Sequence, residues 1–135
     1  MKPTVLDASA LLSMLFGEPG MEEMRALFHK ASAADKPLLM TAVNWAETLN
    51  RITRRQGAAG LAAAKLLPAN GALSVVSVDI ALAEAAAAYK AADLLGLADA
   101  FAAALAKNLK AELVTSDREF KSVESEIKVI WLKNQ

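Results

Sequence analysis

The chain has 135 residues, 55% of them hydrophobic, and its 15 basic and 15 acidic residues give a formal net charge of zero. This length predicts a single domain over residues 1–135 that can bury a core without disulfides. The neutral balance excludes a strongly basic surface that would bind any polyanion. The lack of cysteine and the single histidine exclude thiolate zinc sites and multi-histidine metal sites, so any metal must have oxygen ligands.

The sequence carries no pattern typical of a targeting or membrane segment. The N-terminus reaches Asp7 before an apolar run of signal-peptide length develops. The alanine-rich stretches 83–88 and 98–106 are separated by Tyr89 and Lys90, and both are shorter than the roughly 20 apolar residues that span a bilayer. We therefore expect a soluble, cytoplasmic protein without membrane association.

Five short β-rich runs alternate with helical segments along the chain. Near-continuous apolar strands separated by helices of about ten or more residues are typical of a parallel sheet covered on both faces. The predicted class is therefore α/β, a three-layer α/β/α sandwich around a central, mostly parallel sheet of about five strands. The runs are residues 4–6, 38–41, 73–78, 113–115 and 128–132.

Helix boundaries are marked by turn and capping residues. A Pro-Gly pair opens a helical segment over residues 19–34, and the turn 35–37 leads into the second strand. Thr41 and Asp79 stand where N-caps are expected. In the late helix, which should end near Lys110, apolar residues recur at a spacing of four and predict the face that packs on the sheet. They are Leu97, Phe101, Leu105 and Leu109.

Four acidic residues stand where the predicted fold brings strand ends and helix starts together. In a parallel sheet the carboxyl ends of the strands share one edge, where ligands bind. Carboxylates gathered there repel by roughly 3 kcal/mol per pair at about 5 Å. A divalent cation removes this repulsion, and all-oxygen ligation suits Mg²⁺ or Mn²⁺. The acids are Asp7 after the first strand, Glu47 after the second, Asp99 at the start of the late helix and Asp117 after the fourth strand.

Each acid also has an ordinary structural interpretation that the sequence leaves open. Caps, ion pairs and charged first helical turns place carboxylates at the same kinds of position without any metal. The alternatives are an N-cap of the first helix for Asp7, an ion pair with Arg51 for Glu47, a charged first turn for Asp99, and a capping box of Ser116 with Glu119 around Asp117.

Four segments of the sequence carry a family resemblance. They are VLDASALL (5–12), AVNWAETLNRI (42–52), LGLADAFAAALAKNLKAELVTSDREF (95–120) and IKVIWL (127–132). Together they resemble the PIN domain, specifically the VapC-type toxins of bacterial toxin–antitoxin pairs. The match covers essentially the whole chain, and the phrases LADAFAAALA and LVTSDREF are specific in combination with the N-terminal VLDAS.

The resemblance implies a Mg²⁺-dependent endoribonuclease acting on single-stranded RNA, with Mn²⁺ as an alternative ion. It also implies a homodimer with an α/β/α sandwich fold that a cognate antitoxin holds inactive. The acidic quartet of the family falls on Asp7, Glu47, Asp99 and Asp117, which would be the catalytic residues. Of these, the three aspartates would hold the metal and Glu47 would ligate it or orient the attacking water.

Polar and basic residues near these acids have candidate supporting roles. Ser9 matches a polar family position beside the first aspartate, and Thr115 and Ser116 would orient a water or a carboxylate by hydrogen bonding. A strand end followed by a helix cap is the alternative for the last two. Arg51 and Arg54 lie on one face of the helix after Glu47, where they would contact RNA or the antitoxin, or only offset the helix dipole.

Two other functions remain open from the sequence. The first is an RNA-maturation nuclease of the same fold that acts without an antitoxin. The second is a non-catalytic PIN-like binding module, in which the carboxylates serve only as caps and ion-pair partners. We expect Trp45 and Trp131 to pack in the core or an interface in each case.

Overall fold

The structure is a computed structural model that describes residues 2–92 and 95–133. At its centre lie five strands: β1 (Thr4–Leu6), β2 (Leu38–Thr41), β3 (Leu73–Val76), β4 (Glu112–Thr115) and β5 (Val129–Trp131). They form one sheet in the order β3-β2-β1-β4-β5, and every neighbouring pair is parallel. This confirms the predicted sheet, with β1 in its middle.

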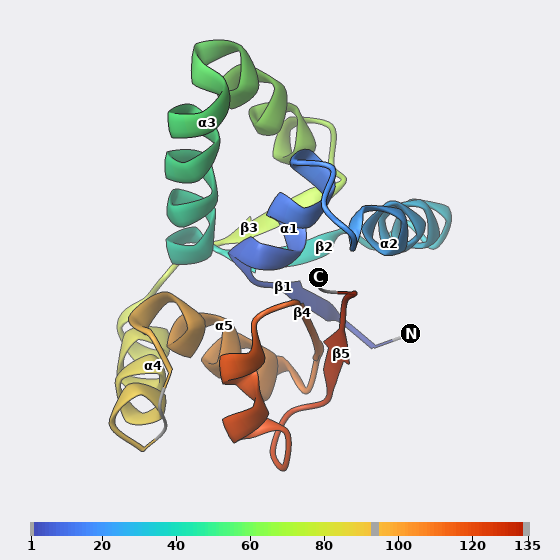
Figure 1. Cartoon of the computed structure of the whole chain (residues 1–135). Coiled ribbons are helices and arrows are strands. Elements are labelled where there is room, and N and C mark those ends of the chain that lie inside the picture. Colours follow the sequence, from blue (N-terminus) through green and yellow to red (C-terminus); the bar gives the residue numbers. More distant parts are fainter. Residues whose placement is uncertain (1, 93–94, 134–135) are drawn as a thin grey trace.

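Helices cover both faces of the sheet (Figure 1). One face carries α1 (Ala8–Leu15), α2 (Met21–Ala33) and α3 (Ala42–Ala69), and the other carries α4 (Ile80–Ala92) and α5 (Leu97–Leu109). A short 3₁₀ helix, η1 (Arg118–Val123), follows β4. The arrangement is the predicted three-layer α/β/α sandwich.

Neighbouring residues of each inner strand supply the two halves of the core. Val5 and Leu113 pack with α4 and α5, whereas Leu6 and Val114 pack with α1 and α2. All four side chains are fully buried. A strand buried on both faces has no polar face, which is why β1 and β4 read as continuous apolar runs rather than alternating ones.

The predicted helix boundaries agree with the structure at their caps. Thr41 Oγ1 accepts a 3.1 Å hydrogen bond from the Asn44 N–H at the start of α3. Asp79 Oδ1 accepts one of 2.8 Å from the Leu82 N–H at the start of α4. The helix α5 ends at Leu109, and the next residue, Lys110, has the left-handed conformation that often follows a helix.

The predicted packing face of α5 is wrong at both of its ends. Leu97 is 59% exposed and Leu109 is 41% exposed, although Phe101 and Leu105 are buried. Small side chains form most of the buried face and let the helix approach the sheet closely, because alanine adds little bulk between the two backbones. They are Ala100, Ala102, Ala103, Ala104 and Ala106.

The helix α3 consists of two segments joined at Gly57. This residue has φ 67° and ψ −160°, a conformation that an L-residue with a side chain rarely adopts. The chain turns back there, so the second segment returns toward β3 (Figure 1). In the described part of the chain, no helix combines the length and the apolar character that spanning a membrane requires.

Candidate active site

The parallel sheet brings the four sequence-predicted acids into one cavity of about 340 Å³. Asp7 directly follows β1, and Asp117 lies just beyond the end of the neighbouring β4. Glu47 comes from the second turn of α3, which follows β2 on the other side of β1, and Asp99 from the first turn of α5. Further lining residues include Ser9, Arg51, Gly96 and Glu119.

Asp7 is buried at the base of this cavity, with 1% of its surface exposed. Its carboxylate accepts hydrogen bonds from Ser9 Oγ at 2.8 Å, the Ala10 N–H at 2.9 Å and Thr115 Oγ1 at 2.6 Å. The Ala10 bond makes Asp7 the N-cap of α1, so the cap and the cavity position belong to the same side chain. Burial raises the pKa of Asp7 to about 6, outweighing the hydrogen bonds, which lower it.

The predicted supporting residues join β1 and β4 through a polar network. Ser9 Oγ accepts a 3.1 Å hydrogen bond from the Ser116 N–H. Thr115 Oγ1 accepts one of 2.9 Å from the Asp117 N–H while it donates to Asp7. Ser9 and Thr115 therefore hold the Asp7 carboxylate directly, whereas Ser116 acts on it through Ser9.

Asp99 faces the other acids from the first turn of α5. Desolvation by burial raises its pKa to about 8, and the charges of Asp117 and Asp7 add to this effect. One carboxylate oxygen each from Asp99, Asp117 and Glu119 lie within 4.8 Å of one another. This group differs from the predicted metal ligands, because Glu119 belongs to it and Asp7 does not.

A capping box of Ser116 with Glu119 was the alternative that the sequence left open around Asp117, and the structure shows a different cap. Asp117 is itself the N-cap of η1, and its Oδ1 accepts a 3.0 Å hydrogen bond from the Glu119 N–H. The side chain of Glu119 lines the cavity instead. The signal in the sequence was a second acid two residues after Asp117, and in the structure carboxylate oxygens of Asp117 and Glu119 lie within 4.8 Å of each other.

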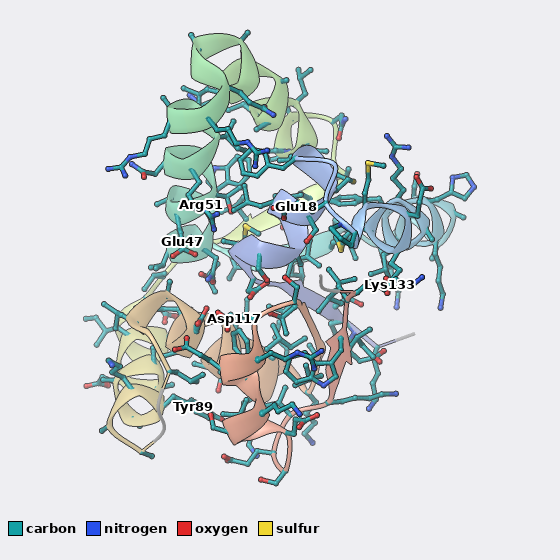
Figure 2. All side chains as sticks on the ribbon, in the orientation of Figure 1. Glu18, Glu47, Arg51, Tyr89, Asp117 and Lys133 are labelled. Carbon is teal, nitrogen blue, oxygen red and sulfur yellow. The ribbon has the colours of Figure 1, made fainter. Side chains whose placement is uncertain are left out.

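Glu47 and Arg51 both line the cavity from α3 (Figure 2). Their spacing of four suggested an ion pair, yet the salt bridges among the described residues do not include one between them. Arg54 is exposed and does not line this cavity. Arg55 stacks on the Phe16 ring at 4.2 Å, so the three arginines have different surroundings.

The donor set fits a hard divalent cation. Three carboxylates close to one another, with a fourth buried beside them, provide only oxygen ligands. The raised pKa values of Asp7 and Asp99 reflect buried and gathered negative charge that a cation would neutralise. Mg²⁺ and Mn²⁺ prefer such ligands.

Comparison with known proteins identifies the family. A family model of the PIN domain matches residues 4–126, so the chain belongs to the PIN domain family. No curated protein sequence matches the chain.

The fold is shared with solved structures of low sequence identity. A chain of DNA-bound VapBC from Salmonella typhimurium is 18% identical at a TM-score of 0.78, covering 96% of this chain and 98% of that one. VapC20 of Mycobacterium tuberculosis, described as a sarcin–ricin loop cleaving toxin, is 20% identical at a TM-score of 0.73, covering 89% and 94%. PAE2754 from Pyrobaculum aerophilum is 23% identical at a TM-score of 0.64, covering 95% and 89%.

Proposed function

We propose that this protein is a Mg²⁺-dependent endoribonuclease that cleaves single-stranded RNA as the toxin of a toxin–antitoxin pair. The observation that carries the proposal is the cavity at the carboxyl edge of the sheet, which is lined by five carboxylates and one arginine. Support comes from the PIN domain match and from the similarity in fold to VapBC complexes and to a toxin described as cleaving the sarcin–ricin loop.

The acids divide into two roles in this proposal. Asp99 and Asp117 would hold the cation together with Glu119, whose carboxylate lies within 4.8 Å of theirs, and Asp7 would complete the acidic lining. When bound, a divalent cation stabilises charge that develops on the phosphate and makes a bound water more acidic. Glu47, exposed at the mouth of the cavity, would orient the water that attacks the phosphorus.

Arg51 would contact an RNA phosphate beside the one that is cleaved. It is the arginine that lines the cavity, and the described structure gives it no ion pair with Glu47. Arg51→Ala should raise KM about three- to tenfold and lower the salt dependence of RNA binding by about one counterion. Arg54→Ala, on the same helix outside the cavity, is the matched control. Equal effects of the two variants would remove this role from Arg51.

Cleavage of a labelled RNA panel tests the catalytic part of the proposal. The protein is stripped of any bound partner and assayed with Mg²⁺, Mn²⁺ or EDTA as wild type, Asp99→Asn and Glu84→Gln. Glu84 is exposed on α4 and does not line the cavity, so its variant controls for the loss of one charge. We expect metal-dependent cleavage that Asp99→Asn abolishes and Glu84→Gln retains. RNA binding without cleavage by folded wild type would favour the non-catalytic binding module.

The biological part of the proposal is tested in cells. Expression of the wild type without a partner should arrest growth, and Asp99→Asn should not. Growth unaffected by an active nuclease would favour an RNA-maturation enzyme that needs no antitoxin. A cytoplasmic location and a single domain over residues 1–135 belong to the same proposal.

We also propose that the protein forms a homodimer. Its support is the exposure of large apolar side chains at the starts of α4 and α5, where Ile80 is 79% and Leu97 is 59% exposed. Light scattering should give twice the mass of the chain for wild type and a lower mass for Ile80→Glu. A monomeric wild type would contradict the homodimer.

A further inference from the structure

The buried side chain of Asn44 connects the two helices that carry Glu47 and Asp99. Asn44 lies in the first turn of α3 and has no exposed surface. Its Nδ2 donates a 3.0 Å hydrogen bond to the backbone carbonyl of Ala98, in the first turn of α5. Its Oδ1 accepts a hydrogen bond from Thr41 Oγ1, at the end of β2.

Both ends of this connection lie next to a cavity acid. Asn44 precedes Glu47 by three residues, about one helical turn, and Ala98 directly precedes Asp99. Among the hydrogen bonds of the described residues, no other one joins α3 to α5. The amide therefore links the backbone that presents Glu47 to the backbone that presents Asp99.

We propose that Asn44 is a positioning residue that sets the separation of Glu47 and Asp99 across the cavity. The catalytic meaning of this role rests on the proposed nuclease function. The site requires a donor toward Ala98 and an acceptor toward Thr41 on a short side chain, and asparagine provides both. Aspartate keeps the shape but loses the donor, and alanine loses both groups.

Substitution of a neighbouring buried residue serves as a control. It distinguishes a positioning role of Asn44 from a general loss of stability. Thr48 is also fully buried, one turn further along α3. Its Oγ1 donates to the Asn44 carbonyl at 2.8 Å and lies 3.8 Å from the Met40 sulfur, so the contacts of this hydroxyl stay within α3 and β2. Thr48→Val removes a buried polar group of the same region without cutting the connection to α5.

The first measurement is divalent cation binding by calorimetry, with Mn²⁺ as the probe. Loss of residues that orient the ligands of a metal typically weakens affinity by about 10- to 100-fold. We expect Asn44→Ala and Asn44→Asp to weaken Mn²⁺ binding at least about tenfold and Thr48→Val to change it less than about twofold. Equal Mn²⁺ affinity in folded Asn44→Ala and wild type would overturn the proposal.

The second measurement is made without metal and determines the distance between α3 and α5. The natural chain has no cysteine, so Asn50→Cys on α3 and Asn108→Cys on α5, both exposed, accept spin labels at defined sites. Pulsed electron resonance should give a broader distance distribution in Asn44→Ala than in wild type or Thr48→Val. An unchanged distribution contradicts the proposal. If Asn44→Ala does not fold, Asn44→Asp, which preserves the volume, decides by the same criterion.

RNA cleavage distinguishes this proposal from the proposed function. A wild type that cuts no RNA, together with the expected split in Mn²⁺ binding and in distances, contradicts the nuclease but supports the positioning role. A wild type that cuts RNA, with Asn44→Asp retaining kcat, Mn²⁺ affinity and the distance distribution, supports the nuclease and overturns the positioning role.

Discussion

Thr115 Oγ1 donates a 2.6 Å hydrogen bond to Asp7 Oδ2, joining the ends of two neighbouring parallel strands. The same hydroxyl accepts a hydrogen bond from the Asp117 N–H. The buried Thr115 side chain therefore fixes the positions of both Asp7 and Asp117. A valine of similar shape would leave the Asp7 oxygen without this donor.

Replacement of Thr115 should therefore reveal the charge state of Asp7. We expect Thr115→Val to destabilise the protein by about 1–3 kcal/mol, the usual cost of an unsatisfied buried acceptor. The loss should be larger at pH 8 than at pH 5, because the hydrogen bond lowers the pKa of Asp7 and its removal penalises the ionised form. Denaturant unfolding at the two pH values measures this. Thr115→Ser retains the hydroxyl and should stay close to wild type, and an equal loss at both pH values would argue against an ionised Asp7.

Topology predicted that the four acids could share one edge of the sheet, and the family resemblance selected the same four as the site. Strands such as β1 and β4, buried on both faces, leave continuous apolar runs in the sequence, and the acid after each run then falls at the ligand-binding edge. Glu119 was missed because its spacing from Ser116 matches a capping box, and the sequence does not distinguish that box from a 3₁₀ turn capped by Asp117.

Other features depend on contacts that no local pattern records. The hydrogen bond from Asn44 to Ala98 joins residues 54 positions apart. The leucine stripe of α5 was a reasonable helical pattern, but it treated alanines as spacers. In the structure Ala103 is fully buried and Leu97 is exposed, because close approach of the helix to the sheet favours the smaller side chain.

The stability of the metal-free protein should fall as pH rises from about 4 to 8. The pKa of Asp7 is raised from 3.8 to about 6 and that of Asp99 to about 8, so the folded state binds these protons more tightly than the unfolded chain. The stability that these protons contribute is fully present below about pH 4 and is lost as pH rises through both folded values. Denaturant unfolding in EDTA at pH 4, 6 and 8 follows this loss.

Substitution isolates the share of Asp99 in that pH dependence. Asp99→Asn cannot ionise, so it should be more stable than wild type by about 1–2 kcal/mol at pH 8, after allowance for solvent screening, and little different at pH 4. For Glu84→Gln, on an exposed part of α4, the difference in stability from wild type should not increase between pH 4 and pH 8. A constant difference between Asp99→Asn and wild type across this range contradicts the raised pKa.

Divalent cations should reverse the destabilisation at high pH. At a concentration of 100 times the dissociation constant, Mn²⁺ should stabilise the folded protein by about 2.7 kcal/mol. The effect should be smaller at pH 5.5, where protons on Asp7 and Asp99 compete with the ion. Thermal unfolding with Mn²⁺ or EDTA measures it. Asp117→Asn should abolish the gain and Glu119→Gln should reduce it, and a full gain in Glu119→Gln would remove Glu119 from the ligands.

Enlarging a buried alanine of α5 should be costly. Ala103 has no exposed surface and lies in the core between α5 and the sheet. Ala103→Leu should destabilise by about 3 kcal/mol, because the added side chain has no space without moving the helix. Ala87→Leu, on the exposed face of α4, is the matched control and should change stability by less than about 0.5 kcal/mol. Similar unfolding midpoints for the two variants would contradict close packing of α5.

The end of α5 offers a stabilising substitution far from the predicted chemistry. Lys110 is exposed and has φ 53° and ψ 42°, a left-handed conformation that costs a residue with a Cβ roughly 1 kcal/mol. Glycine adopts it without this cost, although the unfolded glycine has more entropy to lose. Lys110→Gly should therefore stabilise by about 0.5 kcal/mol. Asn108→Gly, two residues earlier and inside the helix, should destabilise by a similar amount. Denaturant midpoints that move in the same direction for both variants would contradict the left-handed cap.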